Sequence, residues 1–261
     1  MNRLVADIYN FLMPRFCCMC DRRLAPSEKH FCVGCVRKLN RIKYEGEDNH
    51  GVIERLFWGQ IPIVRATAMF MYEGEKTRQI IHKIKYFDNP EIATFLARVF
   101  ARENAASDFF QGVDAIVPLP LSWWREHRRG YNQCDFIASG LGLETGIPVI
   151  RNAVKRTVDN PTQTHLSHEQ RKENVKDIFK LVRPDLLKGK HLLIVDDVIT
   201  TGSTLLSFAS EISDNIDVKI SVFSLAYAGQ MIRAGLPGEI DLSKSVVVHV
   251  RPDNKETVVM P

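Results

Sequence analysis

The sequence lacks the long hydrophobic runs of a membrane-spanning protein. No part of the 261-residue chain reaches the roughly 18 consecutive apolar residues that a helix needs to cross a bilayer. Leu4, Ile8, Phe11 and Leu12 predict an amphipathic helix at the amino terminus. We expect no secretory signal there, because Asp7 interrupts any signal-peptide core. We therefore expect a protein that is not inserted into a membrane and that works in the reducing cytoplasm.

Internal repeats, low-complexity tracts and a strong charge imbalance are absent as well. The formal net charge of +4 permits an anionic ligand, but it falls short of the strongly basic composition of a dedicated nucleic-acid-binding protein. Hydrophobic residues make up 45% of the chain, which is enough to bury a sizeable core. The length favours one main domain with a smaller appendage.

Cysteine is scarce outside one short segment, where Cys17-x2-Cys20 and Cys32-x2-Cys35 form two pairs. Two such turns can direct four thiolates at one Zn2+ ion, which closes a tetrahedral structural site and leaves no position for catalysis. The spacing predicts a small zinc-ribbon-like module with these four cysteines as ligands. Cys18 is an alternative ligand, and disulfide or redox chemistry is the competing interpretation.

From residue 113 onward, short apolar runs alternate with helical patterns. The runs VDAIVPLP, IPVI, KHLLIVDD and VKISVFSLAYA are apolar enough to be strands buried on both faces. An earlier strand is expected in VRATAMFMYEG, followed by helices at residues 75–88 and 90–106; later helices are expected at 134–146 and from Ser203. This order predicts an α/β fold, a parallel sheet flanked by helices, with ligands beyond the carboxyl ends of the strands.

Three regions follow from these patterns. Residues 1–60 hold the amino-terminal helix and the zinc-binding cysteines, residues 61–228 form the α/β domain, and residues 229–261 are an extension to which we assign no role. The first boundary lies in NRIKYEGEDNHGVIERLFWGQIP, which is mixed in composition and has no clean period. Cys134, alone in a helical segment, is expected to be a buried thiol.

Two carboxylates stand at the end of a strand in LLIVDDVITTGST, directly before a turn rich in hydroxyl groups. Asp196 and Asp197 can accept hydrogen bonds from sugar hydroxyls. The turn and the helix that follows it offer N–H groups, hydroxyls and a positive dipole to a phosphate. The residues of this turn are Thr200, Thr201, Gly202, Ser203 and Thr204. Ribose 5-phosphate satisfies both halves, whereas an acidic loop with a helix cap, the competing interpretation, explains one hydroxyl.

LLIVDDVITTGST resembles the phosphoribosyl pyrophosphate (PRPP) motif of type I phosphoribosyltransferases. With the cysteine pairs, IVPLPLSWWREHRRGYNQ and RTVDNPTQTHLSHEQRKENVKDIF, the chain resembles the competence protein F (ComF) family over about residues 10–228. The resemblance implies that Asp196 and Asp197 contact the ribose hydroxyls, that the turn binds the 5-phosphate, and that Pro118, Leu119 and Pro120 lie at the pyrophosphate. It also implies Mg2+ held largely by PRPP oxygens and waters.

The block WWREHRRGYNQ places Arg125, Arg128 and Arg129 directly after the expected pyrophosphate loop. Arginines there can neutralise a departing pyrophosphate, although a solvated basic turn is the alternative. We expect Trp123 and Trp124 to pack on the domain core, with stacking on a base as the alternative.

The polar segment from Arg156 to Val175 falls where type I transferases carry a flexible loop over the site. A mobile surface loop followed by a helix is the alternative for this segment. The positions that match the family pattern are Arg156, Thr157, Gln163, Leu166, Arg171 and Asn174. Closure of such a loop would exclude water from the reacting ribose. His165 and His168 are expected to be exposed polar residues rather than a catalytic pair.

The resemblance implies a pentosyltransferase that displaces pyrophosphate from PRPP, or from another phosphorylated ribose compound, with Asp196 and Asp197 as catalytic residues and Asp197 as the base. Glutamine-dependent amine transfer is not expected from this chain alone, because Asn2 stands where a catalytic cysteine is needed. The alternative is a non-catalytic DNA-uptake factor that binds single-stranded DNA or DNA-uptake proteins. Lys83, Lys85 and the arginine block would then contact the phosphate backbone, with the PRPP site as a sensor or remnant.

Overall fold

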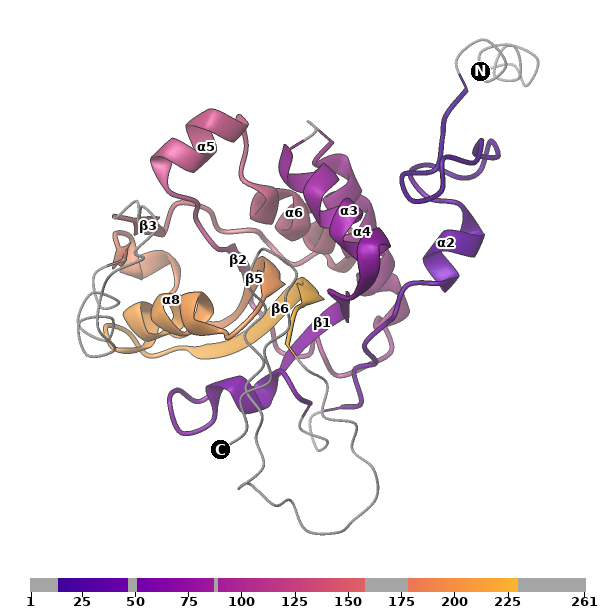
Figure 1. Cartoon of the computed structure of the whole chain (residues 1–261). Helices are drawn as coiled ribbons and strands as arrows, with labels where there is room; N and C mark the ends of the chain where they lie inside the picture. The colour runs from indigo at the N-terminus through magenta and orange to yellow at the C-terminus, as the bar shows by residue number, and fades with distance from the viewer. Residues whose placement is uncertain (1–13, 47–50, 87–88, 158–177, 230–261) are drawn as a thin grey trace, which may run out of the picture. The chain divides into compact units, whose positions relative to one another are not determined.

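The computed structural model describes residues 14–46, 51–86, 89–157 and 178–229 (Figure 1). The expected amino-terminal helix, most of the polar segment after Arg156, including both of its histidines, and nearly all of the carboxyl-terminal extension lie outside these ranges. No helix in the described ranges is long and apolar enough to cross a membrane.

A parallel sheet forms the centre of the molecule and confirms the α/β fold. Its strands are β1 (Ala66–Met71), β2 (Ala115–Pro118), β5 (His191–Ile199) and β6 (Lys219–Tyr227), in the spatial order β1-β6-β5-β2. All three pairings are parallel. Nearly every residue of these strands is buried, because helices cover both faces of the sheet.

The expected strand in IPVI is reduced to a single parallel bridge between Val149 and Ile116. Pro148, in the middle of this run, has no N–H group to donate to a neighbouring strand. A separate antiparallel pair joins β3 (Val154–Arg156) to β4 (Phe179–Leu181).

Helices α3 (Gly74–Tyr86), α4 (Glu91–Glu103) and α6 (Gln133–Thr145) pack on one face of the sheet, and α8 (Ser203–Ser213) packs on the other (Figure 1). Short helices complete the described elements: α2 (Val33–Arg37), α5 (Trp123–Arg129) and the 3-10 turns Glu54–Phe57 and Pro184–Leu186. The helices predicted from apolar spacing at residues 75–88, 90–106 and 134–146 are therefore confirmed.

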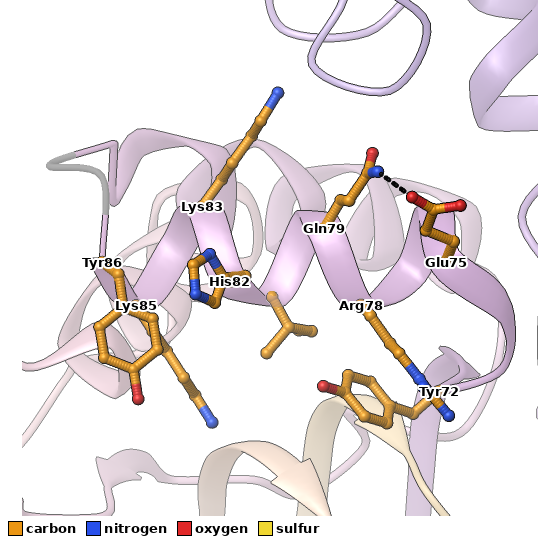
Figure 2. Close-up of a pocket in the computed structure, with 9 residues that line it drawn as sticks. Tyr72, Glu75, Arg78, Gln79, His82, Lys83, Lys85 and Tyr86 are labelled. Carbon is orange, nitrogen blue, oxygen red and sulfur yellow. Dashed lines mark hydrogen bonds between the residues drawn. The ribbon is translucent and has the colours of Figure 1, made fainter. Parts of the chain in front are cut away.

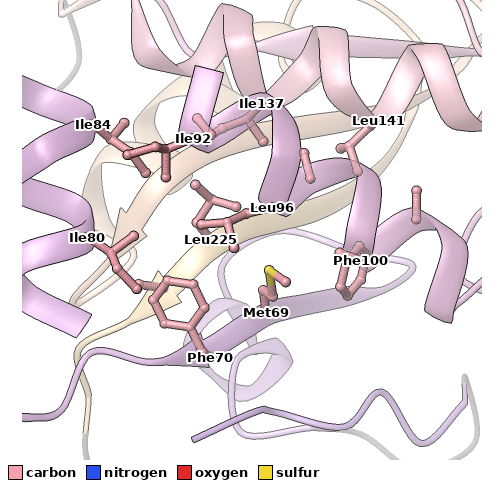
Figure 3. Close-up of a cluster of buried hydrophobic side chains, with 14 of the residues drawn as sticks. Met69, Phe70, Ile80, Ile84, Ile92, Leu96, Phe100, Ile137, Leu141 and Leu225 are labelled. Atoms are coloured by element: carbon pink, nitrogen blue, oxygen red, sulfur yellow. The ribbon is translucent and has the colours of Figure 1, made fainter. Parts of the chain in front are cut away.

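The core under α3, α4 and α6 is filled by aliphatic and aromatic side chains (Figure 3). Ile84 of α3, Leu96 of α4 and Ile137 of α6 meet there with Phe70 and Leu225 of the sheet. Burial of such side chains stabilises the fold by about 1.5–3 kcal/mol each. Helices α3 and α6 are thereby fixed at the carboxyl edge of the sheet, where both contribute polar residues.

Helices α4 and α6 approach each other closely at Gly140. A Cβ atom at this position would lie 2.5 Å from the carbonyl oxygen of Thr94 and 2.8 Å from the Cβ of Ala97. Because real Cβ atoms do not come so close to backbone, only glycine allows this contact. The position of α6, which begins beside the carboxyl edge, depends on it.

The cysteine module (residues 17–39) packs on α3 and α4. Phe31 and Leu39 are buried in the same core as the helices, and the rings of Phe31 and Phe95 lie 5.9 Å apart. Lys83 Nζ of α3 donates a hydrogen bond to the carbonyl oxygen of Cys18 at 2.7 Å. The module therefore shares the hydrophobic core of the α/β domain.

Candidate functional site

A polar cavity of about 360 Å³ lies at the carboxyl ends of β2 and β5. We call it the edge cavity. It is lined by two carboxylates, five basic side chains and a few small or apolar groups: Lys85, Tyr86, Leu119, Pro120, Leu121, Arg125, Arg128, Arg129, Gln133, Cys134, Arg156, Asp196, Asp197 and Thr204. It brings together both predicted acids, all four predicted arginines and part of the predicted strand-end turn. Such a charge distribution suits a ligand with hydroxyl groups and several phosphates.

The two carboxylates differ in their contacts. Asp197 is 4% exposed, and its Oδ2 lies 3.1 Å from Lys85 Nζ in an ion pair. This oxygen receives no hydrogen bond of good geometry from the described residues. Asp196 Oδ1 accepts hydrogen bonds from the Asp197 backbone N–H at 2.8 Å and from the Cys134 thiol at 3.6 Å. Asp197 is thus held by a cation, whereas Asp196 is held by neutral donors.

The pKa of Asp196 is raised from its usual value to about 7. Burial of its carboxyl group is the largest cause, and the negative charge of Asp197 adds to it. The Asp197 N–H, Lys85 and Cys134 oppose this shift but do not cancel it. Asp196 therefore changes its protonation state near neutral pH, which changes whether it can accept hydrogen bonds with both oxygens.

Lys85 is the site residue that sequence reasoning misplaced. The DNA-binding alternative placed it on a surface for the DNA backbone, but the last turn of α3 directs it to Asp197. Burial alone would lower the pKa of Lys85, yet the charges of Asp197 and Asp196 outweigh it and raise that pKa. Lys83 is also engaged, since its ammonium group binds Cys18. Both ammonium groups therefore already have partners within the chain.

The hydroxyl-rich turn joins β5 to α8. Gly202 is the residue before the helix and has φ of 76°, a conformation that glycine adopts without strain. Ser203 N–H points to Thr201 Oγ1 at 3.4 Å. Thr204 lines the edge cavity, and Thr200, Thr201, Gly202 and Ser203 form the adjacent turn. The backbone N–H groups at this helix start are donors of the kind that can bind an anion.

The side chain of Asn132 holds the strand-end turn after β2 in place. Its side-chain amide donates to the Leu119 carbonyl at 3.0 Å, while its Oδ1 caps α6 by accepting from the Cys134 N–H at 3.0 Å. Leu119 and Pro120 line the cavity, whereas Pro118 ends β2 and is buried. An asparagine two residues before a helical pattern is a readable capping signal, but its second bond to Leu119 is not readable from sequence.

The arginine block forms the short helix α5 rather than a turn. Arg125, Arg128 and Arg129 line the edge cavity, and the Arg129 guanidinium lies 5.4 Å from the centre of the Tyr86 ring. Arg129 also donates to the side chain of Gln133. Arg156 reaches the cavity from β3, above the Phe179 ring at 5.5 Å. The four arginines therefore come from two separate elements, α5 and β3, and Lys85 comes from a third, α3.

The prediction that Trp123 and Trp124 pack on the core is wrong. They are 63% and 64% exposed, and the Trp123 ring stacks on His127 at 5.1 Å. Helix α5 has no buried residue at all. Because the arginines of this short helix face the cavity, its aromatic residues are left on the solvent side.

The sulfur atoms of Cys17, Cys20, Cys32 and Cys35 lie within 4.8 Å of one another. None of these residues forms a disulfide, and the backbone N–H of Cys32 donates to the sulfur of Cys17 at 3.3 Å. This geometry fits four thiolates around one tetrahedral Zn2+ ion. Cys18 is not among the four residues of this cluster.

Comparisons with known proteins identify a family and relatives that this chain resembles. The family model described as "Phosphoribosyl transferase domain" matches residues 84–237. The DNA utilization protein YhgH of Escherichia coli strain K12 is 37% identical over 224 residues, 82% of this chain and 97% of that protein. Competence protein F of Haemophilus influenzae is 30% identical over 224 residues, 81% of this chain and 96% of that protein. The match to the YhgH protein of Salmonella typhi, 37% identical over 150 residues, spans 56% of this chain and 65% of that protein.

Proposed function

Because the chain belongs to the family of phosphoribosyltransferase-domain proteins that includes competence protein F, we propose that it binds PRPP with Mg2+ and transfers the 5-phosphoribosyl group to a nucleophilic acceptor. The observation that carries this proposal is the edge cavity, which is lined by two carboxylates, four arginines and Thr204 at the start of α8. A reducing cytoplasm suits both this chemistry and the free thiols.

The ribose 5-phosphate half of PRPP fits the β5 end of the cavity. The turn around Gly202 offers N–H groups and hydroxyls to the 5-phosphate. Asp196 and Asp197 lie in the carboxyl-terminal half of β5 and can accept hydrogen bonds from the two ribose hydroxyls. Asp197 Oδ2 is buried and lacks a good hydrogen bond in the described residues, so a ligand hydroxyl would satisfy it.

The pyrophosphate half fits the opposite side, against α5 and the turn after β2. Arg125, Arg128 and Arg129 supply donors and positive charge where negative charge accumulates as pyrophosphate leaves. Mg2+, held by PRPP oxygens and waters near the two aspartates, would neutralise further charge on the pyrophosphate when it is bound. The cation-rich side and the carboxylate side thus bind different ends of one ligand.

In the proposed reaction, the acceptor attacks C1 of the ribose as the bond from C1 to the pyrophosphate oxygen breaks. The electron pair of that bond leaves with pyrophosphate, and an ionised aspartate takes the proton that the acceptor loses. Asp197 is the proposed base. The chain's main contribution is to hold PRPP in position and to stabilise the leaving group.

The decisive experiment is calorimetric titration of Mg2+–PRPP into the full-length protein. Wild type is expected to bind, and Asp196→Asn with Asp197→Asn is expected to weaken binding at least about 100-fold, because two charge-assisted contacts are lost. Asp185→Asn, on the exposed Pro184–Leu186 turn, is the matched control and should bind as wild type does. Absence of binding to folded, zinc-loaded wild type would refute the proposal.

A second candidate function is single-stranded DNA binding, as the names of the relatives invite. One observation favours it: Trp123 and Trp124 are exposed beside the arginines of α5, and bases stack on such side chains. Oligothymidylate should then quench tryptophan fluorescence in a salt-dependent way. Trp123→Ala with Trp124→Ala should abolish binding, while Trp58→Ala, an exposed tryptophan elsewhere, should not.

A further inference from the structure

A second cavity lies beside the edge cavity, along the side of α3. It has a volume of about 430 Å³, and we call it the α3 cavity. Lys85 and Tyr86, at the end of α3, line both cavities. Tyr72, directly after β1, lines the far end. Since β1 and β5 are both neighbours of β6 in the parallel sheet, the two cavities share one carboxyl edge.

The walls of the α3 cavity are mainly rings and aliphatic carbon. Figure 2 shows Tyr72 with Arg78 at one end and Tyr86 with Lys85 at the other, with His82 between them. The His82 and Tyr86 rings lie 4.8 Å apart. A volume of this size is within the range of small-molecule sites, and rings at both ends favour a flat aromatic ligand.

The charged groups of the α3 cavity favour an anionic ligand. Arg78 is exposed and directed along the cavity wall (Figure 2). Glu75 is the one carboxylate among the lining residues described, and it accepts a hydrogen bond from Gln79 at 3.1 Å. Lys83 contributes only the aliphatic part of its side chain, because its ammonium group is hydrogen-bonded to the carbonyl oxygen of Cys18. Arg78 can therefore bind a carboxylate or phosphate group of a ligand.

We propose that the α3 cavity is the acceptor site and that the acceptor is a planar aromatic amine or nitrogen heterocycle with an anionic substituent. This inference rests on the proposed transfer from PRPP. The ring lies between Tyr72 and Tyr86, the anionic group binds Arg78, and the nucleophilic nitrogen faces the edge cavity past Lys85. The nitrogen lone pair forms the bond to C1, pyrophosphate leaves with the electron pair of the broken C1–O bond, and the nitrogen proton passes to Asp197.

Two probes that differ in one group test the charge requirement. 2-Aminobenzoate is a fluorescent planar amine with a carboxylate, and 2-aminobenzamide is its uncharged counterpart. Fluorescence titration of the full-length protein should give about tenfold tighter binding of the benzoate, because a charge-assisted hydrogen bond is gained. Arg78→Gln should remove this preference and leave binding of the amide unchanged. Lys76→Gln, an exposed cation on α3 outside the cavity lining, should keep the preference.

A second variant tests the ring contact of the ligand instead of its charge. Tyr72→Ala should weaken both probes to a similar extent, because it removes a ring contact, and circular dichroism checks that it folds. Equal binding of the two probes, no binding of either, or a preference that Arg78→Gln leaves intact would overturn the assignment of the cavity.

The same proteins are titrated with Mg2+–PRPP in parallel. If the protein binds PRPP but neither probe, the α3 acceptor site is refuted and the proposed PRPP site is not. Probe binding that depends on Arg78, together with no PRPP binding to wild type, sinks the proposed transfer and not the cavity.

Discussion

The cysteine module and the edge cavity are assembled in opposite ways. The four sulfurs of the module come from residues 17–35, a single short stretch whose turns bring them within 4.8 Å. The edge cavity draws on α3, the turn after β2, α5, α6, β3, β5 and the start of α8. A site built from local sequence can form before the fold is complete, whereas the edge cavity exists only when the whole sheet is in place.

The two regions nevertheless meet on one helix. Lys83 binds the carbonyl of Cys18 in the module, and Lys85, two residues later, pairs with Asp197 in the cavity. Variants of each region therefore measure how far the module and the cavity depend on each other.

Loss of the metal site should have the largest effect. Cys35→Ser removes a buried sulfur of the cluster, and we expect zinc to fall from about one per chain to near zero, since structural zinc contributes on the order of 10 kcal/mol to folding of such modules. Hydrogen exchange should then become fast throughout the cysteine module. Cys18→Ser is the matched control and should keep its zinc. An unchanged zinc content in Cys35→Ser would show that Cys35 is not a zinc ligand.

Loss of the Lys85 ion pair should have the next largest effect. Lys85→Met leaves the buried Asp197 without its cation, and we expect about 3 kcal/mol less stability in urea unfolding. Lys83→Gln removes one hydrogen bond to the module and should cost about 1 kcal/mol. Equal losses would mean that the ion pair contributes no more than an ordinary contact.

The pH dependence of PRPP binding tests whether Asp196 must be ionised to bind the ligand. Its pKa of about 7 means that the carboxyl group is largely protonated at pH 6 and ionised at pH 8. PRPP affinity should therefore rise about tenfold over this interval, with Asp196→Asn weak at both values. A pH profile that the asparagine variant retains would assign the titration to another group.

The same raised pKa fixes the sign of a stability effect. Between the ordinary aspartate pKa and about 7, the folded state holds the proton of Asp196 more tightly than the unfolded state does. The free energy of unfolding should fall as pH rises through this window. Asp196→Asn should flatten that dependence in thermal melts.

Removal of the exposed tryptophans should have the smallest effect on stability. Trp123→Ala with Trp124→Ala is expected to change the free energy of unfolding by less than about 0.5 kcal/mol, because helix α5 buries no residue. A loss of several kcal/mol would restore the core-packing prediction that the structure contradicts.

The sequence predicted those parts of the molecule whose residues lie close together along the chain. The two cysteine pairs, the apolar strands and the Asp-Asp turn each lie within one short segment, so their spacing carries the information. Cys134 and Asn132 were not identified as site residues, and Lys85 was assigned only to the DNA-binding alternative. The contacts of all three depend on the strand order β1-β6-β5-β2, which places distant segments side by side. The orientation of Trp123 was missed because a short helix can leave an apolar side in solvent.

The pairing of β1 with β6 sets the order in which this chain can be completed during synthesis. Residues 66–71 emerge early from the ribosome, but their strand partner is residues 222–227, near the end of the described chain. Until then, β1 is a largely apolar strand without the parallel neighbour with which it pairs. The nascent chain must therefore protect this segment from premature association over the translation of about 150 residues, and truncation before residue 222 would leave an aggregation-prone fragment rather than a smaller domain.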